Sequence, residues 1–143
     1  MIFEFVFAGL IFIGLIFFIL VQLNSTTARY NETGIRAAMK MEAVRIAKML
    51  VEGGPITLVD EKLVLNQTKI RQLEDYCNNN YAELLQDLEL GWRGPHGFTQ
   101  WRIGIQIQNR TGIENVCGIA GQITAKRLAL LNNEPVMVIV SLS

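Results

Sequence analysis

The chain has 143 residues, 50% of them hydrophobic, and its 13 basic and 13 acidic side chains give a formal net charge of zero. This balance argues against a basic nucleic-acid-binding surface, so we expect no nucleic-acid partner, and the apolar content argues against a disordered chain. Glu4 is the only charged residue before Arg29, so a first segment with a single charge is joined to a charged remainder. This division argues against a soluble cytosolic enzyme.

The first segment is apolar enough to cross a membrane. Every residue from Phe5 to Val21 is apolar or glycine, 17 in a row, and the polar run 24–27 begins only after Leu23. A bilayer core of about 30 Å needs roughly 17 to 25 such residues in a helix. Large apolar side chains occupy all sides, as in a helix surrounded by lipid or by other apolar helices. A secretory signal peptide would begin with basic residues, whereas this chain begins Met-Ile-Phe-Glu.

Glu4 places a carboxylate just inside this apolar segment, where an isolated charge is costly. One interpretation is that Glu4 lies at the membrane interface and reaches the headgroups. The other is that Glu4 binds the free amino-terminal ammonium of Met1 in another copy when the apolar helices pack together. No Lys or Arg precedes the segment, although the cytoplasmic flanks of membrane helices are usually basic. Removal of a basic leader would explain both the missing charge and the free amine.

Sequons and cysteines indicate that the rest of the chain is exported. Four asparagines stand in the Asn-X-Ser/Thr pattern of glycan acceptors, where chance would give about one: Asn24, Asn31, Asn66 and Asn109. The two cysteines, Cys77 and Cys117, have no third or fourth ligand nearby for a metal. An even pair in an exported segment predicts a disulfide that closes a loop of about 40 residues. We expect N-linked glycans and no other cofactor.

The apolar segment continues into an amphipathic stretch. Its apolar residues recur at positions 35, 39, 43, 46, 47 and 50, a helical stripe with charges opposite. The run Gly53-Gly54-Pro55 stops this pattern. We therefore predict one nearly continuous helix from about residue 3 to 52. The predicted domains are this helix over 1–52, with an apolar part (1–23), a polar collar (24–34) and an amphipathic part (35–52), and a head over 55–143.

The remainder predicts a small head of mixed structure. In chain order we expect a hairpin of 56–59 and 62–65 around Asp60-Glu61, a helix over 67–77 capped by Asn66, a short helix near 81–88, a half-buried strand from Trp101 to Ile107, and a hairpin of 127–131 and 136–140 around 132–135. The expected fold class is therefore α+β. A long N-terminal hydrophobic helix precedes a small, mainly antiparallel β head with one or two short helices.

The sequence gives little indication of a catalytic site. His96 is the only histidine and stands in a glycine-rich loop, so we expect a solvated turn residue rather than a base. The adjacent carboxylates Asp60-Glu61 and Glu74-Asp75 are expected on solvated surfaces. We expect no catalytic, cofactor-binding or metal site. Three aromatic residues are expected mainly in the core, with an exposed platform for sugars or surfaces as the alternative: Trp92, Phe98 and Trp101.

Three features together resemble type IV pilin-like filament subunits, especially those of archaea. They are Glu4, the uncharged run from Phe5 to Leu23, and the amphipathic continuation through Leu50 into an exported head rich in sequons. The resemblance covers the first third of the chain by pattern and the head only in kind. It implies that a prepilin peptidase removes a basic leader, that the helices bundle as a filament core, and that the near-terminal glutamate satisfies a neighbouring amine. In that family the glutamate usually stands one place further along than Glu4.

The function that this resemblance implies is that of a structural subunit of an extracellular pilus, with no enzymatic activity. The helices would form a helical homopolymer with the glycosylated heads outside, for adhesion or surface attachment. The implied partners are other copies of the chain, the ATP-driven pilus assembly machinery, the prepilin peptidase, and the cytoplasmic membrane before assembly. The alternative is a single-span membrane-anchored extracellular binding protein, or a minor pilin.

Overall fold

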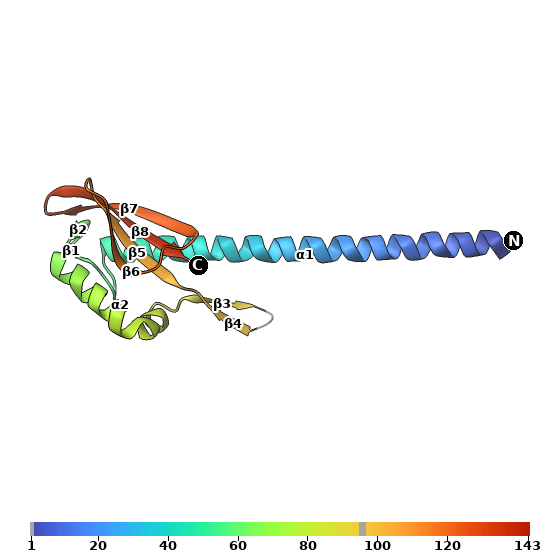
Figure 1. The fold of residues 1–143 in the computed structure, drawn as a ribbon, viewed down its shortest axis with the longest axis horizontal. Coiled ribbons are helices and arrows are strands. Elements are labelled where there is room, and N and C mark those ends of the chain that lie inside the picture. The colour runs from blue at the N-terminus through green and yellow to red at the C-terminus, as the bar shows by residue number, and fades with distance from the viewer. Residues whose placement is uncertain (1, 95–96) are drawn as a thin grey trace. The chain divides into compact units, whose positions relative to one another are not determined.

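The computed structural model describes residues 2–94 and 97–143, and these ranges form two helices and eight strands (Figure 1). The predicted α+β fold class is confirmed, because a long apolar helix precedes a mostly antiparallel sheet with a second helix. The chain divides into a first unit that ends at Ile35 and a compact head unit from Arg36 to Ser143. The elements are α1 (Ile2–Glu52), β1 (Val59–Glu61), β2 (Val64–Leu65), α2 (Gln67–Asp87), β3 (Gly91–Gly94), β4 (Gly97–Gln100), β5 (Ile103–Gln108), β6 (Ile113–Gly118), β7 (Ile123–Leu131) and β8 (Glu134–Leu142).

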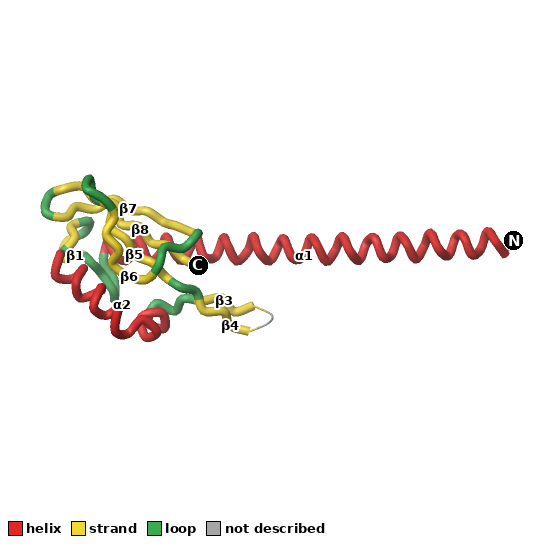
Figure 2. Tube along the Cα trace, viewed as in Figure 1, coloured by secondary structure: helices red, strands yellow, loops and turns green. Residues whose placement is uncertain are grey.

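Helix α1 is continuous from Ile2 to Glu52 (Figure 2), which confirms the predicted helix. From Ile2 to Leu23 its side chains are exposed. Within the head unit α1 is amphipathic, and most of the predicted apolar stripe is buried. The helix ends where the Gly53 N–H donates to the Met49 carbonyl at 3.2 Å. The buried residues of the stripe are Met39, Ala43, Ile46, Ala47, Leu50 and Val51.

The main sheet has the strand order β1-β2-β7-β8-β5-β6, and its neighbouring strands are antiparallel except for β2 and β7. Because successive side chains of a strand point to opposite faces, alternate residues of the central strands share one face. Three isoleucines of β5 lie opposite three residues of β8 on this face, and all six are buried: Ile103, Ile105 and Ile107 with Leu142, Val140 and Val138. This face, the stripe of α1 and the buried side of α2 supply the core of the head unit.

The first predicted hairpin exists, but its turn was placed wrongly. Asp60 and Glu61 belong to β1 rather than to the turn, which lies at residues 62–63. Leu63 has a positive φ of 67°, an uncommon conformation for a leucine. Its N–H donates to the Val51 carbonyl at 2.7 Å, and its own carbonyl accepts from the Leu130 N–H at 2.8 Å. Hydrogen bonds to α1 and β7 therefore hold a turn that the local residue types do not indicate.

The last predicted hairpin is confirmed, with a tighter turn than expected. Asn132 and Asn133 have φ values of 54° and 66°, as in the two-residue turns that suit the twist of paired strands. Glu134 and Pro135 therefore start β8 instead of lying in the turn. Pairing of β8 with β5 begins only at Met137, so the missing N–H of Pro135 interrupts no ladder with that strand.

Helix α2 joins the two helices that the sequence predicts over 67–77 and 81–88. The two parts meet at Asn80, whose φ of −133° and ψ of 38° are not helical. Across this kink the Tyr76 hydroxyl donates to Asp87 at 2.8 Å, and this hydrogen bond raises the pKa of Tyr76 above its ordinary value. Asn66 caps the first turn as predicted, because its side-chain oxygen accepts from the N–H groups of Thr68 and Lys69.

Strands β3 and β4 were not predicted from the sequence. They pair only with each other, as a two-stranded sheet outside the main one, and they carry glycines instead of an alternating apolar pattern. The Phe98 ring covers the backbone of Gly91, where an added Cβ would lie 2.2 Å from the Phe98 Cζ. Of the predicted glycine-rich loop, Gly94 ends β3 and Gly97 begins β4, and His96 lies outside the described residues.

Strand β6 was also missed, and it forms one edge of the main sheet. Cys117 pairs with Ile105 and Asn115 pairs with Gln106, so Val116 is an extra residue that makes a bulge. The edge strand on the other side, β1, has only three residues. Bulged or very short edge strands are poor templates for further strand pairing.

Candidate functional site

From Ile2 to Leu23, helix α1 presents a largely apolar surface on all sides. By length and composition α1 could cross a membrane, and the apolar window has none of its area buried. Phe3 is 90% exposed, close to the maximum for a large apolar side chain. Glu4 lies in the first turn of α1 and lines a shallow hollow with Phe3, Phe7, Ala8 and Ile11. Met1, the predicted partner of Glu4 in another copy, lies outside the described residues.

The polar collar begins with hydroxyl groups that bond to the helix itself. Ser25 and Thr26 donate to the Gln22 carbonyl at 3.0 and 2.8 Å, and Thr27 donates to the Leu23 carbonyl at 2.8 Å. Such bonds satisfy hydroxyl donors within a helix and tend to bend it slightly. These side chains therefore need no partner outside α1 for their donors.

The four predicted glycan acceptors occupy different environments. Asn24 and Asn31 are exposed on α1, in the first unit. Asn109 is half-buried in the turn between β5 and β6, where its side-chain oxygen accepts from the Thr111 N–H at 2.9 Å and the Gly112 N–H at 2.8 Å. Asn66 is half-buried as the cap of α2. Glycosylation at these four positions stays a prediction.

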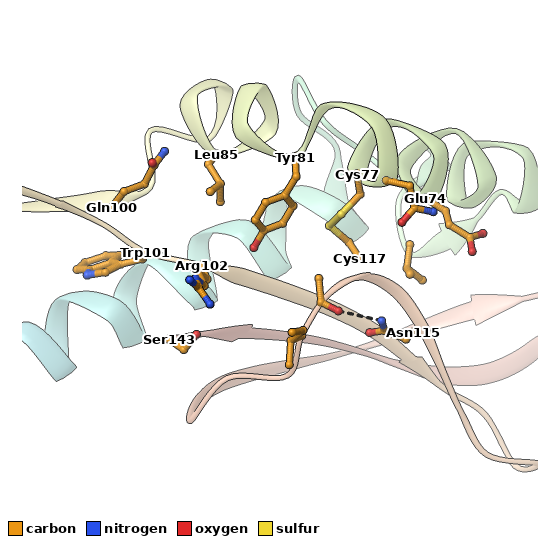
Figure 3. Close-up of a pocket in the computed structure, with 14 residues that line it drawn as sticks. Glu74, Cys77, Tyr81, Leu85, Gln100, Trp101, Arg102, Asn115, Cys117 and Ser143 are labelled. Atoms are coloured by element: carbon orange, nitrogen blue, oxygen red, sulfur yellow. Dashed lines mark hydrogen bonds between the residues drawn. A yellow bond between two sulfur atoms is a disulfide. The ribbon is translucent and has the colours of Figure 1, made fainter.

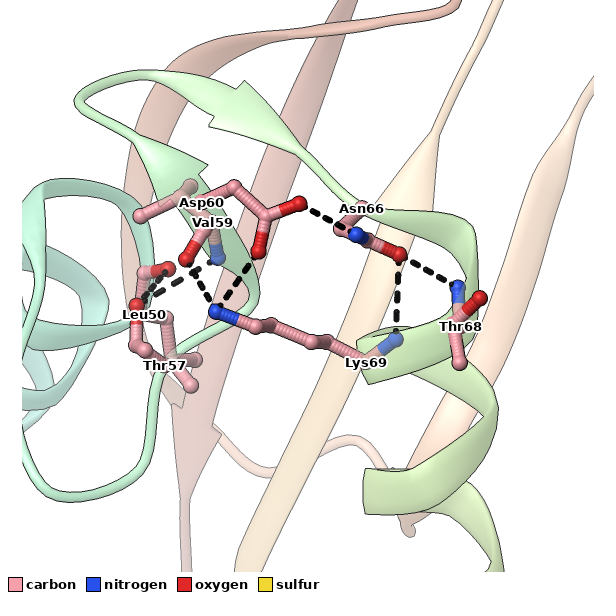
Figure 4. A network of polar contacts seen from close by, with 7 residues as sticks. All are labelled: Leu50, Thr57, Val59, Asp60, Asn66, Thr68 and Lys69. Carbon is pink, nitrogen blue, oxygen red and sulfur yellow. Dashed lines mark hydrogen bonds and ion pairs between the residues drawn. The ribbon is translucent and has the colours of Figure 1, made fainter.

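Asn66 also belongs to a polar network that ties β1 to α2 (Figure 4). Its amide nitrogen donates to Asp60, and the Lys69 ammonium lies 2.9 Å from the same carboxylate. Lys69 donates in addition to the Val59 carbonyl at 2.7 Å. The hydrogen bonds from Asn66 and from Lys69 lower the pKa of Asp60 below its ordinary value.

Acid is expected to weaken this network. Because the folded-state pKa of Asp60 is lowered, its contribution to stability is present above the unfolded pKa of about 4 and is lost as the pH falls through the folded value. Asp60→Asn should therefore make the unfolding midpoint in urea less sensitive to pH below about pH 4 than in the wild type. Glu61→Gln, which removes a neighbouring exposed carboxylate, is the control and should keep the wild-type dependence. Equal acid sensitivity of Asp60→Asn and the wild type would contradict the assignment.

The structure joins Cys77 of α2 to Cys117 of β6 by a disulfide, with Cα atoms 5.6 Å apart and both residues buried. Disulfides persist in oxidising compartments, so this one hints at an extracellular location. The disulfide also lines a groove of the head unit, which has a volume of about 850 Å³ (Figure 3). The groove residues are Glu74, Cys77, Asn78, Tyr81, Leu85, Gln100, Trp101, Arg102, Asn115, Val116, Cys117, Gly118, Ile119 and Ser143.

The mouth of the groove lies at the end of β6, where the pairing of β6 with β5 stops. The Tyr81 hydroxyl lies there, donating to the Ile103 carbonyl and accepting from the Ile103 N–H, both at 2.9 Å. Gly118 ends β6 with a φ of 60°, and a Cβ at this position would lie 2.0 Å from the Ile103 oxygen. Only glycine fits so close a backbone approach. One tyrosine and one glycine thus shape the mouth of the groove, and neither was singled out in the sequence.

The aromatic prediction was right for one residue and wrong for two. Trp101 is 4% exposed and belongs to the core, as expected. Trp92 and Phe98 are 37% and 60% exposed, because the β3–β4 hairpin stands outside the main sheet and offers them no core. The two side chains do not form one platform, because Trp92 pairs with Thr99 and Phe98 pairs with Arg93, which places the two aromatic residues on opposite faces of the hairpin.

Among the described residues, no group of three or more His, Cys, Asp or Glu side chains could hold a metal ion. Asp60, Glu61 and Asp75 are exposed and Glu74 is half-buried at the groove. No model of a known protein family, no curated protein and no solved structure matches this chain. Its function must therefore be inferred from its own geometry.

Proposed function

We propose that this chain is a structural subunit of an extracellular filament of the type IV pilus kind. It polymerises through the apolar part of α1 and carries the head units on the outside. The observation that supports this most directly is the exposure of every large apolar side chain from Ile2 to Leu23. An uninterrupted apolar surface on all sides of a helix requires lipid or other apolar helices around it.

Glu4 favours helices over lipid as the final surroundings. The segment from Ile2 to Leu23 contains no second charged residue, so within one copy Glu4 has no cation nearby on this stretch. Apolar helices gain little hydrophobic free energy on leaving lipid for one another, so packing and polar contacts must drive their association. In our proposal the Glu4 carboxylate meets an amino-terminal ammonium of another copy, which neutralises both charges inside the bundle.

The proposed head surface is consistent with an exported filament. The disulfide between Cys77 and Cys117 suits an oxidising space. In our proposal Asn24, Asn31, Asn66 and Asn109 carry glycans, adhesion or surface attachment is the role of the filament, and an assembly machine extracts the subunits from the cytoplasmic membrane.

The direct test is to shear filaments from cells that make the protein and examine them by electron microscopy and mass spectrometry. Polymers composed mainly of this chain are expected. If the chain is recovered only with membranes and no polymer contains it, the proposal fails and a single-span anchor with an extracellular binding head replaces it. Trace amounts in filaments built from another protein would instead indicate a minor pilin.

Loss of the Glu4 charge is expected to reduce assembly. Glu4→Gln keeps the size of the side chain and removes its charge, and Glu4→Ala removes both. Leaving a partner charge unpaired in an apolar bundle costs about 3–5 kcal/mol, so filament yield should fall at least about tenfold in both variants. The yield is measured by quantitative immunoblotting of sheared filaments against the membrane-inserted pool.

The control for this measurement is Glu134→Gln, which neutralises an exposed carboxylate of the head unit and should leave the yield unchanged. Head folding in each variant is checked by protection of the disulfide from thiol reagents. Wild-type filament yield in Glu4→Gln would place Glu4 at the membrane interface and contradict the proposed contact.

A further inference from the structure

We propose that the groove between α2 and β6 binds a neutral, hydroxyl-rich ligand, namely an oligosaccharide chain. The groove lies entirely within the head unit, so this inference does not depend on filament formation. Its volume of about 850 Å³ is in the range of small-molecule sites in proteins.

The inner wall of the groove is apolar. It is formed by Leu85 of α2, Val116 of β6 and the disulfide, all of them buried, with the edge of Trp101 at one end (Figure 3). A sugar ring presents an apolar face of C–H groups, and such a wall can cover it and exclude water. An apolar wall alone would take many ligands, so the polar rim decides the class.

The rim carries polar side chains without partners in the protein. Within the described ranges, the side chains of Glu74, Asn78, Gln100 and Arg102 make no hydrogen bond or ion pair. Each carboxamide offers two N–H donors and an oxygen acceptor, which is the pairing that adjacent hydroxyl groups require. One carboxylate and one guanidinium balance in charge, so the rim favours a neutral ligand over a strongly acidic or basic one.

The backbone of the groove does not favour an extended peptide. A peptide that adds to a sheet edge needs free N–H and carbonyl groups along that edge. Here the Tyr81 hydroxyl occupies both polar groups of Ile103, and Asn115 donates to the Gly118 carbonyl at 2.9 Å. Arg102 and Ser143 bond to each other through their backbones at 2.8 and 3.1 Å. These bonds occupy the backbone at the Ile103 and Gly118 end of the groove, and the unpartnered side chains of the rim suit a ligand rich in hydroxyls.

Exposed aromatic side chains continue from one end of the groove. Gln100 lies on the rim and is also the last residue of β4, so the hairpin with Trp92 and Phe98 leads directly into the site. Both aromatic residues are exposed on this hairpin. Phe98 lies on the same face of the hairpin as Gln100 and Trp92 on the opposite face, so Phe98 is the aromatic side chain suited to an additional sugar unit of a longer chain.

The test uses the full chain, solubilised in a detergent without a sugar headgroup, and saturation-transfer NMR with two probes, maltotriose and tri-N-acetylchitotriose. Transfer to at least one of these sugars is expected. The double variant Asn78→Ala with Gln100→Ala should weaken that binding about tenfold or more, because it removes two hydrogen-bonding side chains. The matched control is Asn79→Ala with Gln86→Ala, two exposed positions of α2 that do not line the groove. The control should bind as the wild type does.

Absence of transfer to both sugars overturns the proposal, as does unchanged binding by the double variant. Tighter binding of a tetra-alanine peptide than of either sugar overturns it in favour of a peptide site. Since the measurement is made on the solubilised chain, failure of the proposed filament would leave the result unaffected, and the two failures are distinguishable.

Discussion

Replacement of Cys77 and Cys117 by alanine is expected to lower the free energy of unfolding of the head unit by about 4 kcal/mol. The disulfide spans 40 residues, and a cross-link of that length removes conformational entropy from the unfolded chain. It also joins α2 to an edge strand, which otherwise contributes few buried side chains. The change is measured by urea unfolding of the detergent-solubilised chain, with fluorescence of the buried Trp101 as the signal.

Chemical reduction of the wild type should reproduce most of this loss, because it cuts the cross-link without changing any side-chain position. Asn79→Ala, two residues from Cys77 on the exposed side of α2, is the matched control and should change the free energy of unfolding by less than about 0.5 kcal/mol. A loss below about 1 kcal/mol in the double alanine variant would show that the disulfide does not constrain the unfolded head.

Leu50→Ala is expected to cost about 2–5 kcal/mol of head stability, the usual range for deletion of a fully buried leucine side chain. Leu50 is fully buried in the stripe that α1 contributes to the core. Its carbonyl accepts from the Leu58 N–H at 3.0 Å, and the alanine variant keeps that bond. The loss therefore measures packing alone, and urea unfolding followed through Trp101 is again the assay.

Met41→Ala is the matched control for this prediction. Met41 is on the same helix but 74% exposed, so its truncation should cost less than about 0.5 kcal/mol. Equal effects of the two substitutions would mean that the stripe of α1 is not packed into the head, and the second half of α1 would then be a solvated helix.

The sequence predicted α1 well because its signal is long and repetitive. An uncharged run followed by a 3.6-residue stripe up to Leu50 allows no other regular structure of that length. Asn66 was likewise found because an N-cap depends on neighbouring residues only. The hairpin turn at Asn132 and Asn133 was nearly right, since asparagine tolerates the positive φ values that such a turn requires.

What the sequence could not predict depends on contacts between distant residues. The turn at Leu63 is held by hydrogen bonds to Val51 and Leu130, so the neighbouring residues give no signal for it. Strands β3 and β4 carry no alternating pattern, because they have no core to face. The groove has no local motif either. It combines residues of α2, β6 and the segment 100–102, and its mouth depends on Tyr81 and Gly118.

The blunt edges of the main sheet have a consequence for any crowded arrangement of heads. Side-by-side stacking of β domains at high local concentration invites cross-β aggregation, in which open strands of one molecule continue the sheet of the next. Here the edge strand β1 is three residues long and the edge strand β6 is interrupted at Val116, whereas β2 pairs with β7 only at Leu130 and Leu131 and leaves the rest of β7 without a neighbouring strand on that side among the described residues. We therefore expect β1 and β6 to resist strand pairing between neighbouring heads, and any amyloid-like fusion of heads to start from the uncovered part of β7.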